Sequence, residues 1–185
     1  MLKLKKVVAL VLSAATMFAV NVTALAQEAT ETITADRIIS QNGDTTIGVR
    51  TPTTGPITRG HIYDHEIYVI KDVGAGYSVE VGALVNMGDG AGGYFNEILD
   101  YWSVASGSGS YEWEPSYVYA TLLNSDTLEL KTSGYIVVAI DSSLSGTVGA
   151  ELLGANFEVS STIGQTTYYR KRVSISEKIY AWDEI

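Results

Sequence analysis

The chain has 185 residues, no cysteine and a net charge of −9, from 12 lysine and arginine residues against 21 aspartate and glutamate residues. Such an acidic chain argues against nucleic acid and against anionic lipid headgroups as partners. The lack of cysteine excludes a disulfide framework and a cysteine nucleophile, so packing alone must hold the fold.

The first 26 residues have the three parts of a secretory signal peptide. Three lysines in the first six residues precede an apolar run over residues 7–20, and Ala24 and Ala26 supply the small residues before a cleavage site. The run is shorter than the ~20 residues that a membrane-spanning helix needs. We therefore expect cleavage after Ala26 and secretion from a bacterial cell.

Residues 27–185 are expected to form one domain. They number 159, enough to bury a substantial core, and would carry a net charge of −12 because the leader holds three lysines and no acid. Residues 27–35 are predicted to be a loose lead-in to this domain.

Alternation of apolar and polar residues predicts β-strands along most of the domain. Residues 77–85 place Tyr, Val, Val, Ala and Val on one face, and the same alternation recurs in residues 147–154, 155–161 and 168–176. Residues 135–140 are apolar throughout, which is typical of a central strand covered on both faces.

Turn residues separate these segments at short intervals. Asn42-Gly43 and Asn124 to Asp126 are hairpin signals, as is the stretch 141–146, while Pro52 and Pro56 indicate a loop or an edge. Many short strands at hairpin spacing predict an all-β fold, an antiparallel β-sandwich with jelly-roll or Greek-key connections.

One segment has helical periodicity. Phe95, Ile98, Leu99 and Trp102 recur at intervals of three and four residues, so a short helix is expected near residues 94–101. No other helix is expected in the domain.

The densest aromatic stretch runs from Tyr101 to Tyr117. Aromatic rings beside hydroxyls and acids can hold sugar rings, but each ring can equally bury ~150–250 Å² in a core. Core packing, ligand binding and catalysis all stay open for this stretch. The candidate ligand-binding residues are Trp102, Tyr111, Trp113 and Tyr117.

Acids in the same region are candidates for catalysis, although no catalytic set is assigned. Glu112 and Glu114 would lie ~6.6 Å apart on one face of a strand, a separation compatible with a glycosidase carboxyl pair. Glu97 and Asp100 supply a second pair on the predicted helix. Such spacings are also those of ordinary solvated acids.

Neither a metal site nor a cofactor is expected. The two histidines, His61 and His65, would lie ~13 Å apart on a strand, too far to share one ion. The basic cluster Arg170 to Arg172 is expected to pair with the many acids, and docking of an anionic ligand is the alternative.

The leading functional hypothesis is a secreted bacterial binding or interaction module without catalytic activity, for polysaccharide or cell-surface ligands. Its partner would be an extracellular glycan or another secreted or surface protein, and a membrane partner is not expected. One alternative is a small jelly-roll glycan hydrolase or lyase. Another is an outer-membrane β-barrel or a protein that inserts a hairpin into a membrane.

Overall fold

The computed structural model describes residues 34–52, 62–88, 93–141 and 145–181. The predicted signal peptide, the start of the predicted lead-in, Pro56 and His61 lie outside these ranges. In the described part, nine strands and one short helix follow each other in the order β1 (Thr34–Asn42), β2 (Thr45–Pro52), β3 (Ile62–Gly74), β4 (Tyr77–Gly88), β5 (Tyr94–Ala105), β6 (Glu112–Asn124), β7 (Thr127–Asp141), α2 (Ser145–Gly154), β8 (Glu158–Ile163) and β9 (Thr166–Tyr180).

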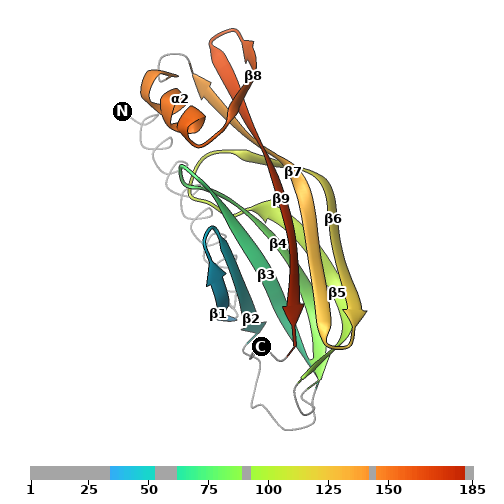
Figure 1. The fold of residues 1–185 in the computed structure, drawn as a ribbon. Helices are drawn as coiled ribbons and strands as arrows, with labels where there is room; N and C mark the ends of the chain where they lie inside the picture. Colours follow the sequence, from blue (N-terminus) through green and yellow to red (C-terminus); the bar gives the residue numbers. More distant parts are fainter. Residues whose placement is uncertain (1–33, 53–61, 89–92, 142–144, 182–185) are drawn as a thin grey trace, which may run out of the picture. The chain divides into compact units, whose positions relative to one another are not determined.

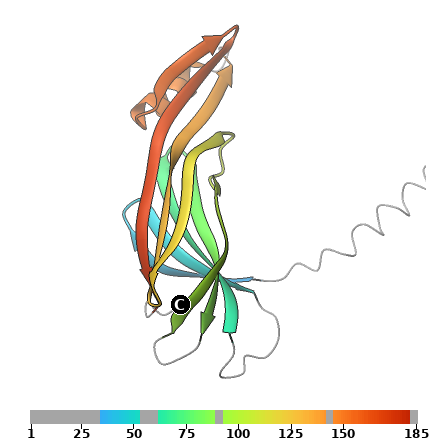
Figure 2. The same ribbon diagram turned by 90° about the vertical axis from the view of Figure 1, so that its right-hand side faces the viewer.

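The strands form two antiparallel sheets that pack face to face, which confirms the predicted all-β sandwich (Figures 1 and 2). Sheet A has the order β1-β2-β3-β4-β5, and sheet B has the order β6-β7-β9-β8. Consecutive strands are neighbours throughout sheet A, whereas in sheet B β9 returns between β7 and β8. The connections are thus a meander and two hairpins, simpler than the jelly-roll or Greek-key connections expected from the sequence.

The core lies between the two sheets and follows the predicted alternation. In β4 the side chains of Val79, Val81, Ala83 and Val85 are fully buried, and Leu128 of β7 is fully buried on the facing sheet. Burying a side chain of this size stabilises the fold by about 1.5–3 kcal/mol. The inner faces of both sheets therefore hold the sandwich together, and their outer faces are left for polar residues.

Residues 94–101 are not a helix, because they belong to β5. The pairing of β5 with β4 shifts register twice, so that Phe95 lies opposite Met87, Ile98 opposite Val85 and Tyr101 opposite Ala83. Each bulge adds one residue to β5, which brings residues three apart onto the same inner face. The two bulges therefore imitate the three-residue spacing of a helix.

The helix that does form, α2, occupies residues 145–154, for most of which the alternation predicted a strand. It ends in a Schellman motif: Phe157 N donates to Leu152 O at 2.9 Å, and Asn156 N donates to Leu153 O at 3.0 Å. Asn156 adopts the positive φ of 61° that this motif requires. Leu152 and Phe157 are both buried, so the motif also anchors the helix to the core.

Residues 135–140 lie in β7, which is a central strand as predicted, with β6 and β9 on either side. Only one of its faces is fully buried, however. Ile136, Val138 and Ile140 are in the core, whereas Ala139 on the other face is exposed. The apolar composition of the strand therefore overstates its burial, because its outer face is open to solvent.

The hairpin signals at Asn42-Gly43 and at Asn124 to Asp126 are confirmed as turns between β1 and β2 and between β6 and β7. Gly43 has a φ of 60°, which a glycine adopts without strain. No helix in the described ranges is long and apolar enough to cross a membrane.

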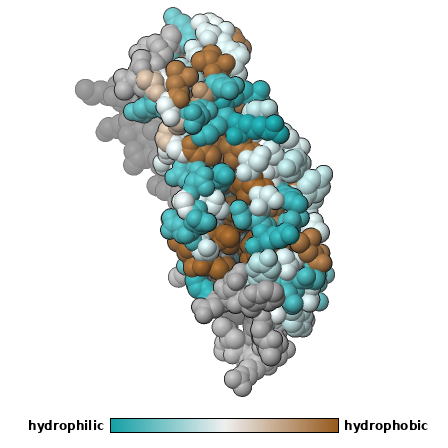
Figure 3. Space-filling view, in the orientation of Figure 1, coloured by the Kyte–Doolittle hydropathy of each residue, from teal (hydrophilic) through white to brown (hydrophobic). Residues whose placement is uncertain are grey.

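Exposed apolar residues gather at the end of the molecule where α2 and β8 lie (Figure 3). Val148 and Leu153 belong to α2, and Val159 and Ile163 belong to β8. On the side seen in Figure 3, hydrophobic patches are also visible along the middle and the lower part of the molecule, between hydrophilic residues.

Candidate functional site

The structure does not bring the four candidate ligand-binding aromatics together. Tyr111 and Trp113 lie at the inner side of the sandwich, half-buried against the core. The Tyr111 hydroxyl donates to Ser78 O at 2.6 Å, and Trp113 Nε1 donates to Ser103 Oγ at 2.9 Å. Both bonds connect the segment after β5 to sheet A, so these two residues serve packing.

Trp102 lies on the outer face of sheet A. Its ring covers Gly82 on the neighbouring strand, and a Cβ on Gly82 would overlap that ring. Its Nε1 donates to Glu80 Oε1 at 3.1 Å. A glycine thus lets the indole lie flat on the sheet, and the acid fixes its orientation.

An arginine clamp extends from Glu80 across three strands of sheet A. Arg50 of β2 reaches over the Tyr68 ring of β3, 3.9 Å from its centroid, and donates two hydrogen bonds of 2.9 Å to Glu80 of β4. Tyr68 in turn donates its hydroxyl proton to Asp36 of β1. Glu80 is only 5% exposed although it lies on an outer face, because Arg50 and Trp102 cover it.

The electrostatics of the clamp agree with this geometry. The bond to Glu80 raises the pKa of Arg50 above its ordinary value. Burial, and then the bond to Asp36, raise the pKa of Tyr68 to about 12. Among the described residues, no buried side-chain nitrogen or oxygen lacks a hydrogen-bond partner. The outer face of sheet A is therefore a closed network that offers no open polar group at Glu80.

The outer face of sheet B carries a pair of exposed aromatic rings on one strand. Tyr117 and Tyr119 of β6 are 42% and 58% exposed, and their ring centroids are 5.5 Å apart at an interplanar angle of 32°. Tyr117 lies opposite Ser133 of β7, whose hydroxyl is 2.9 Å from that of Ser174 on β9. We call this surface the tyrosine face and define it by Tyr117, Tyr119, Tyr135, Ser133 and Ser174.

Only Tyr117 of the tyrosine face was a candidate from the sequence. Tyr119 stands two residues later in the sequence, and two residues apart on a strand means the same face. This two-residue spacing could therefore have identified Tyr119 from the sequence. Tyr135 and the two serines come from other strands, and only the register of β6, β7 and β9 places them beside Tyr117.

The candidate catalytic acids are not assembled into one site. Glu112 and Glu114 are exposed on β6 of sheet B, where Glu114 forms an ion pair with Arg170. Glu97 and Asp100 are exposed on β5 of sheet A, opposite Asn86 and Leu84. The two pairs thus belong to the outer faces of different sheets, and all four side chains are exposed.

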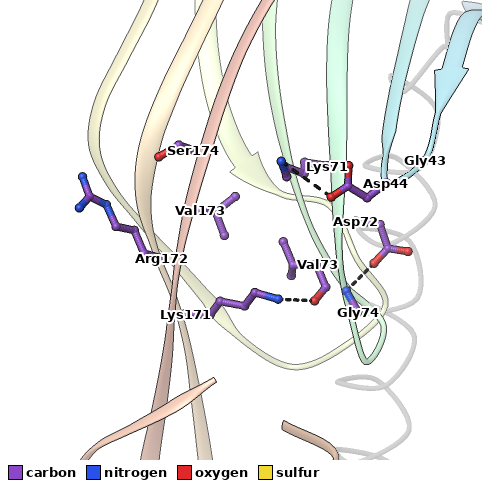
Figure 4. A pocket seen from close by; sticks show the side chains of 10 residues that line it. All are labelled: Gly43, Asp44, Lys71, Asp72, Val73, Gly74, Lys171, Arg172, Val173 and Ser174. Carbon is purple, nitrogen blue, oxygen red and sulfur yellow. Dashed lines mark hydrogen bonds and ion pairs between the residues drawn. The ribbon is translucent and has the colours of Figure 1, made fainter. Parts of the chain in front are cut away.

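The basic cluster is divided between the two faces of β9 (Figure 4). Lys171 points inward and donates to the main-chain oxygens of Val73 and Ala155, both at 2.7 Å. It lies beside a cleft of about 590 Å³ between the sheets. Burial lowers the pKa of Lys171 from its ordinary value. Its ammonium thus ties β9 to sheet A and to the end of α2.

Arg170 and Arg172 belong to the outer face of sheet B. Arg170 lies 4.5 Å from the centroid of the Tyr135 ring and pairs with Glu114 on β6. This arrangement repeats the clamp of sheet A, since an arginine again crosses a tyrosine to reach a glutamate on the third strand. It makes the Tyr135 ring part of a fixed surface.

His65 is the one histidine within the described ranges. Burial lowers its pKa, and its Nδ1 lies 3.1 Å from Thr51 Oγ1. No group of three or more histidine, aspartate and glutamate side chains in the described segments is placed to hold a metal ion.

The chain was compared with protein-family models, with curated proteins and with solved structures, and none of the three comparisons finds a match. Its own residues must therefore carry the functional argument.

Proposed function

We propose that the protein is a secreted bacterial binding module without catalytic activity, and that it holds polysaccharide on the tyrosine face. Secretion is proposed from the basic, apolar and small-residue parts of residues 1–26. Binding is proposed from the outer face of sheet B.

The observation that carries the proposal is the pair of exposed rings at Tyr117 and Tyr119. Two aromatic rings on one strand, tilted by only 32°, form a shallow platform on which sugar rings can stack. A tyrosine keeps a hydroxyl for hydrogen bonding beside its apolar ring, and it has few torsions to order on binding. The exposed hydroxyl of Ser174 on β9, which bonds the buried hydroxyl of Ser133 on β7, adds a polar group at the same level of the sheet.

The surroundings of the platform fit an extended ligand better than a small molecule. Small-molecule sites are typically concave pockets that bury most of their ligand. The tyrosine face lies on the outside of a sheet and runs across β6, β7 and β9. A polymer can lie along such a surface and contact several strands, so the geometry favours a polysaccharide chain.

Retention on insoluble polysaccharide tests the proposal. Residues 27–185 would be incubated with chitin, cellulose, pectin and isolated peptidoglycan, and the bound fraction measured for wild type and for the double variant Tyr117→Ala/Tyr119→Ala. Tyr101→Ala is the matched control, since Tyr101 is 48% exposed but lies on β5 of sheet A.

We expect at least one polysaccharide to retain wild type and the Tyr101 control, and the double variant to lose most of that retention. Equal retention of all three proteins would show that the tyrosine face is not the site. Failure of every polysaccharide to retain wild type would turn the assignment toward a protein partner.

A further inference from the structure

A notch interrupts the edge of sheet B beside the tyrosine face. β8 pairs with β9 only as far as Glu158 opposite Arg170, whereas β9 continues to Tyr180. A hollow of about 610 Å³ opens where the pairing stops. The residues that line it with charged side chains are Glu158, Arg170, Lys171 and Arg172, and Tyr135, Asn156 and Ser160 add neutral polar groups.

The two arginines of the hollow differ in their partners. Arg170 forms an ion pair with Glu114, and its guanidinium lies over the Tyr135 ring, so both groups stabilise its positive charge. Arg172 is exposed and forms no ion pair with any residue that the structure describes. Figure 4 shows its guanidinium directed away from the cleft that Lys171 lines. Arg172 therefore presents an available cation on the outer face.

We propose that Arg172 binds a carboxylate group of an acidic polysaccharide whose sugar rings lie on the tyrosine face. This inference rests on the function proposed above and adds the ligand class. A guanidinium presents parallel N–H donors that match the two oxygens of a carboxylate, and charge-assisted bonds of this kind are among the stronger ones in proteins.

The register places Arg172 within reach of the same polymer. Arg172 lies opposite Tyr135, and the next outward pair along the two strands is Ser133 and Ser174. Tyr117 lies opposite Ser133 on the far side of β7. Arg172 lies two strands away from Tyr117 across the sheet and two residues away along the strand direction. These steps place their Cα atoms about 12 Å apart. An oligosaccharide of a few units spans that distance, so one chain can contact both.

The negative net charge of the chain and the carboxylate of Glu158 both oppose the binding of an anion. The electric field of the net charge is screened over about 8 Å at physiological ionic strength. Glu158 is a like charge within the hollow, and its neutralisation should strengthen binding. Acidic polymer is therefore recognised through the local contact with Arg172 and not through long-range attraction.

Pectin provides a matched pair of probes, because de-esterified pectin carries free carboxylates and highly methyl-esterified pectin carries the same backbone with few of them. Affinity electrophoresis at about 0.15 M salt would give the dissociation constant of residues 27–185 for each polymer. The variants are Arg172→Gln, Glu158→Gln and, as the matched control, Lys178→Gln. Lys178 is another exposed cation of β9, so its loss changes the net charge equally.

We expect wild type and Lys178→Gln to prefer the de-esterified polymer, and Arg172→Gln to lose about tenfold in affinity for it with little change toward the esterified one. Glu158→Gln should bind the de-esterified polymer more tightly. Equal affinity of wild type for the two polymers, or equal losses in Arg172→Gln and Lys178→Gln, would overturn the inference and leave the proposed function standing. If wild type bound neither pectin and was retained on no other polysaccharide, both the inference and the proposed function would be overturned.

Discussion

Replacing Trp113 by alanine should destabilise the protein without removing its ligand-binding surface. The indole is half-buried against the core, and its Nε1 bonds to Ser103 Oγ at 2.9 Å. Truncation of a fully buried tryptophan costs about 3–5 kcal/mol, and because Trp113 is only partly buried we expect about 2 kcal/mol from its lost packing. Loss of the hydrogen bond adds about 1 kcal/mol. We expect a total of about 3 kcal/mol.

For a domain of this size, 1 kcal/mol corresponds to about 2–4 °C in Tm, so Trp113→Ala should melt about 6–12 °C below wild type. Calorimetry of residues 27–185 measures this directly. Tyr117→Ala is the control, because its ring is already 42% exposed and its removal should shift Tm by about 2 °C or less. A Trp113→Ala protein that melts within about 2 °C of wild type would refute the assignment of this side chain to packing.

Three further predictions concern the polar contacts. Glu80→Ala should lower the free energy of unfolding by about 2–4 kcal/mol in urea titrations, because it leaves Arg50 and Trp102 without their acceptor in a largely covered site. Tyr68 has its pKa raised from 10 to about 12, so it contributes stability that is complete below pH 10 and is lost as pH rises to about 12. Tyr68→Phe should therefore lose less stability than wild type between pH 10 and pH 12, and equal losses would contradict the burial of its hydroxyl. Lys171→Met should lower the urea midpoint by an amount equivalent to about 1–2 kcal/mol, since two main-chain oxygens lose their donor.

The period-2 pattern of the sequence was sufficient to predict the two-sheet core. Residues 77–85 alternate without interruption, and their apolar members are the buried face of β4. The pattern failed where the backbone departs from regular geometry. Two bulges in β5 give the apolar residues of segment 94–101 the spacing of a helix. In α2, small and apolar residues alternate with other residues over a few positions, and this alternation resembles that of a strand.

The candidate site was predicted less well, because it depends on which strands are neighbours. The sequence left core packing, ligand binding and catalysis open for the aromatic stretch. In the structure Trp102 lies on the outer face of sheet A, Trp113 packs against the core and Tyr117 lies on the outer face of sheet B. Only pairing between distant segments reveals that Tyr117 shares its face with residues of β7 and β9. No local pattern in the sequence records that register.

The location of the ligand on sheet B is tested most directly by nuclear magnetic resonance. Amide signals of ¹⁵N-labelled residues 27–185 would be followed as an oligosaccharide from the retaining polysaccharide is added. We expect the shifts to concentrate at Tyr117, Tyr119, Ser133 and Ser174, with little change at Trp102 on sheet A. Shifts that concentrate around Trp102, with the signals of Tyr117 and Tyr119 unchanged, would contradict this expectation.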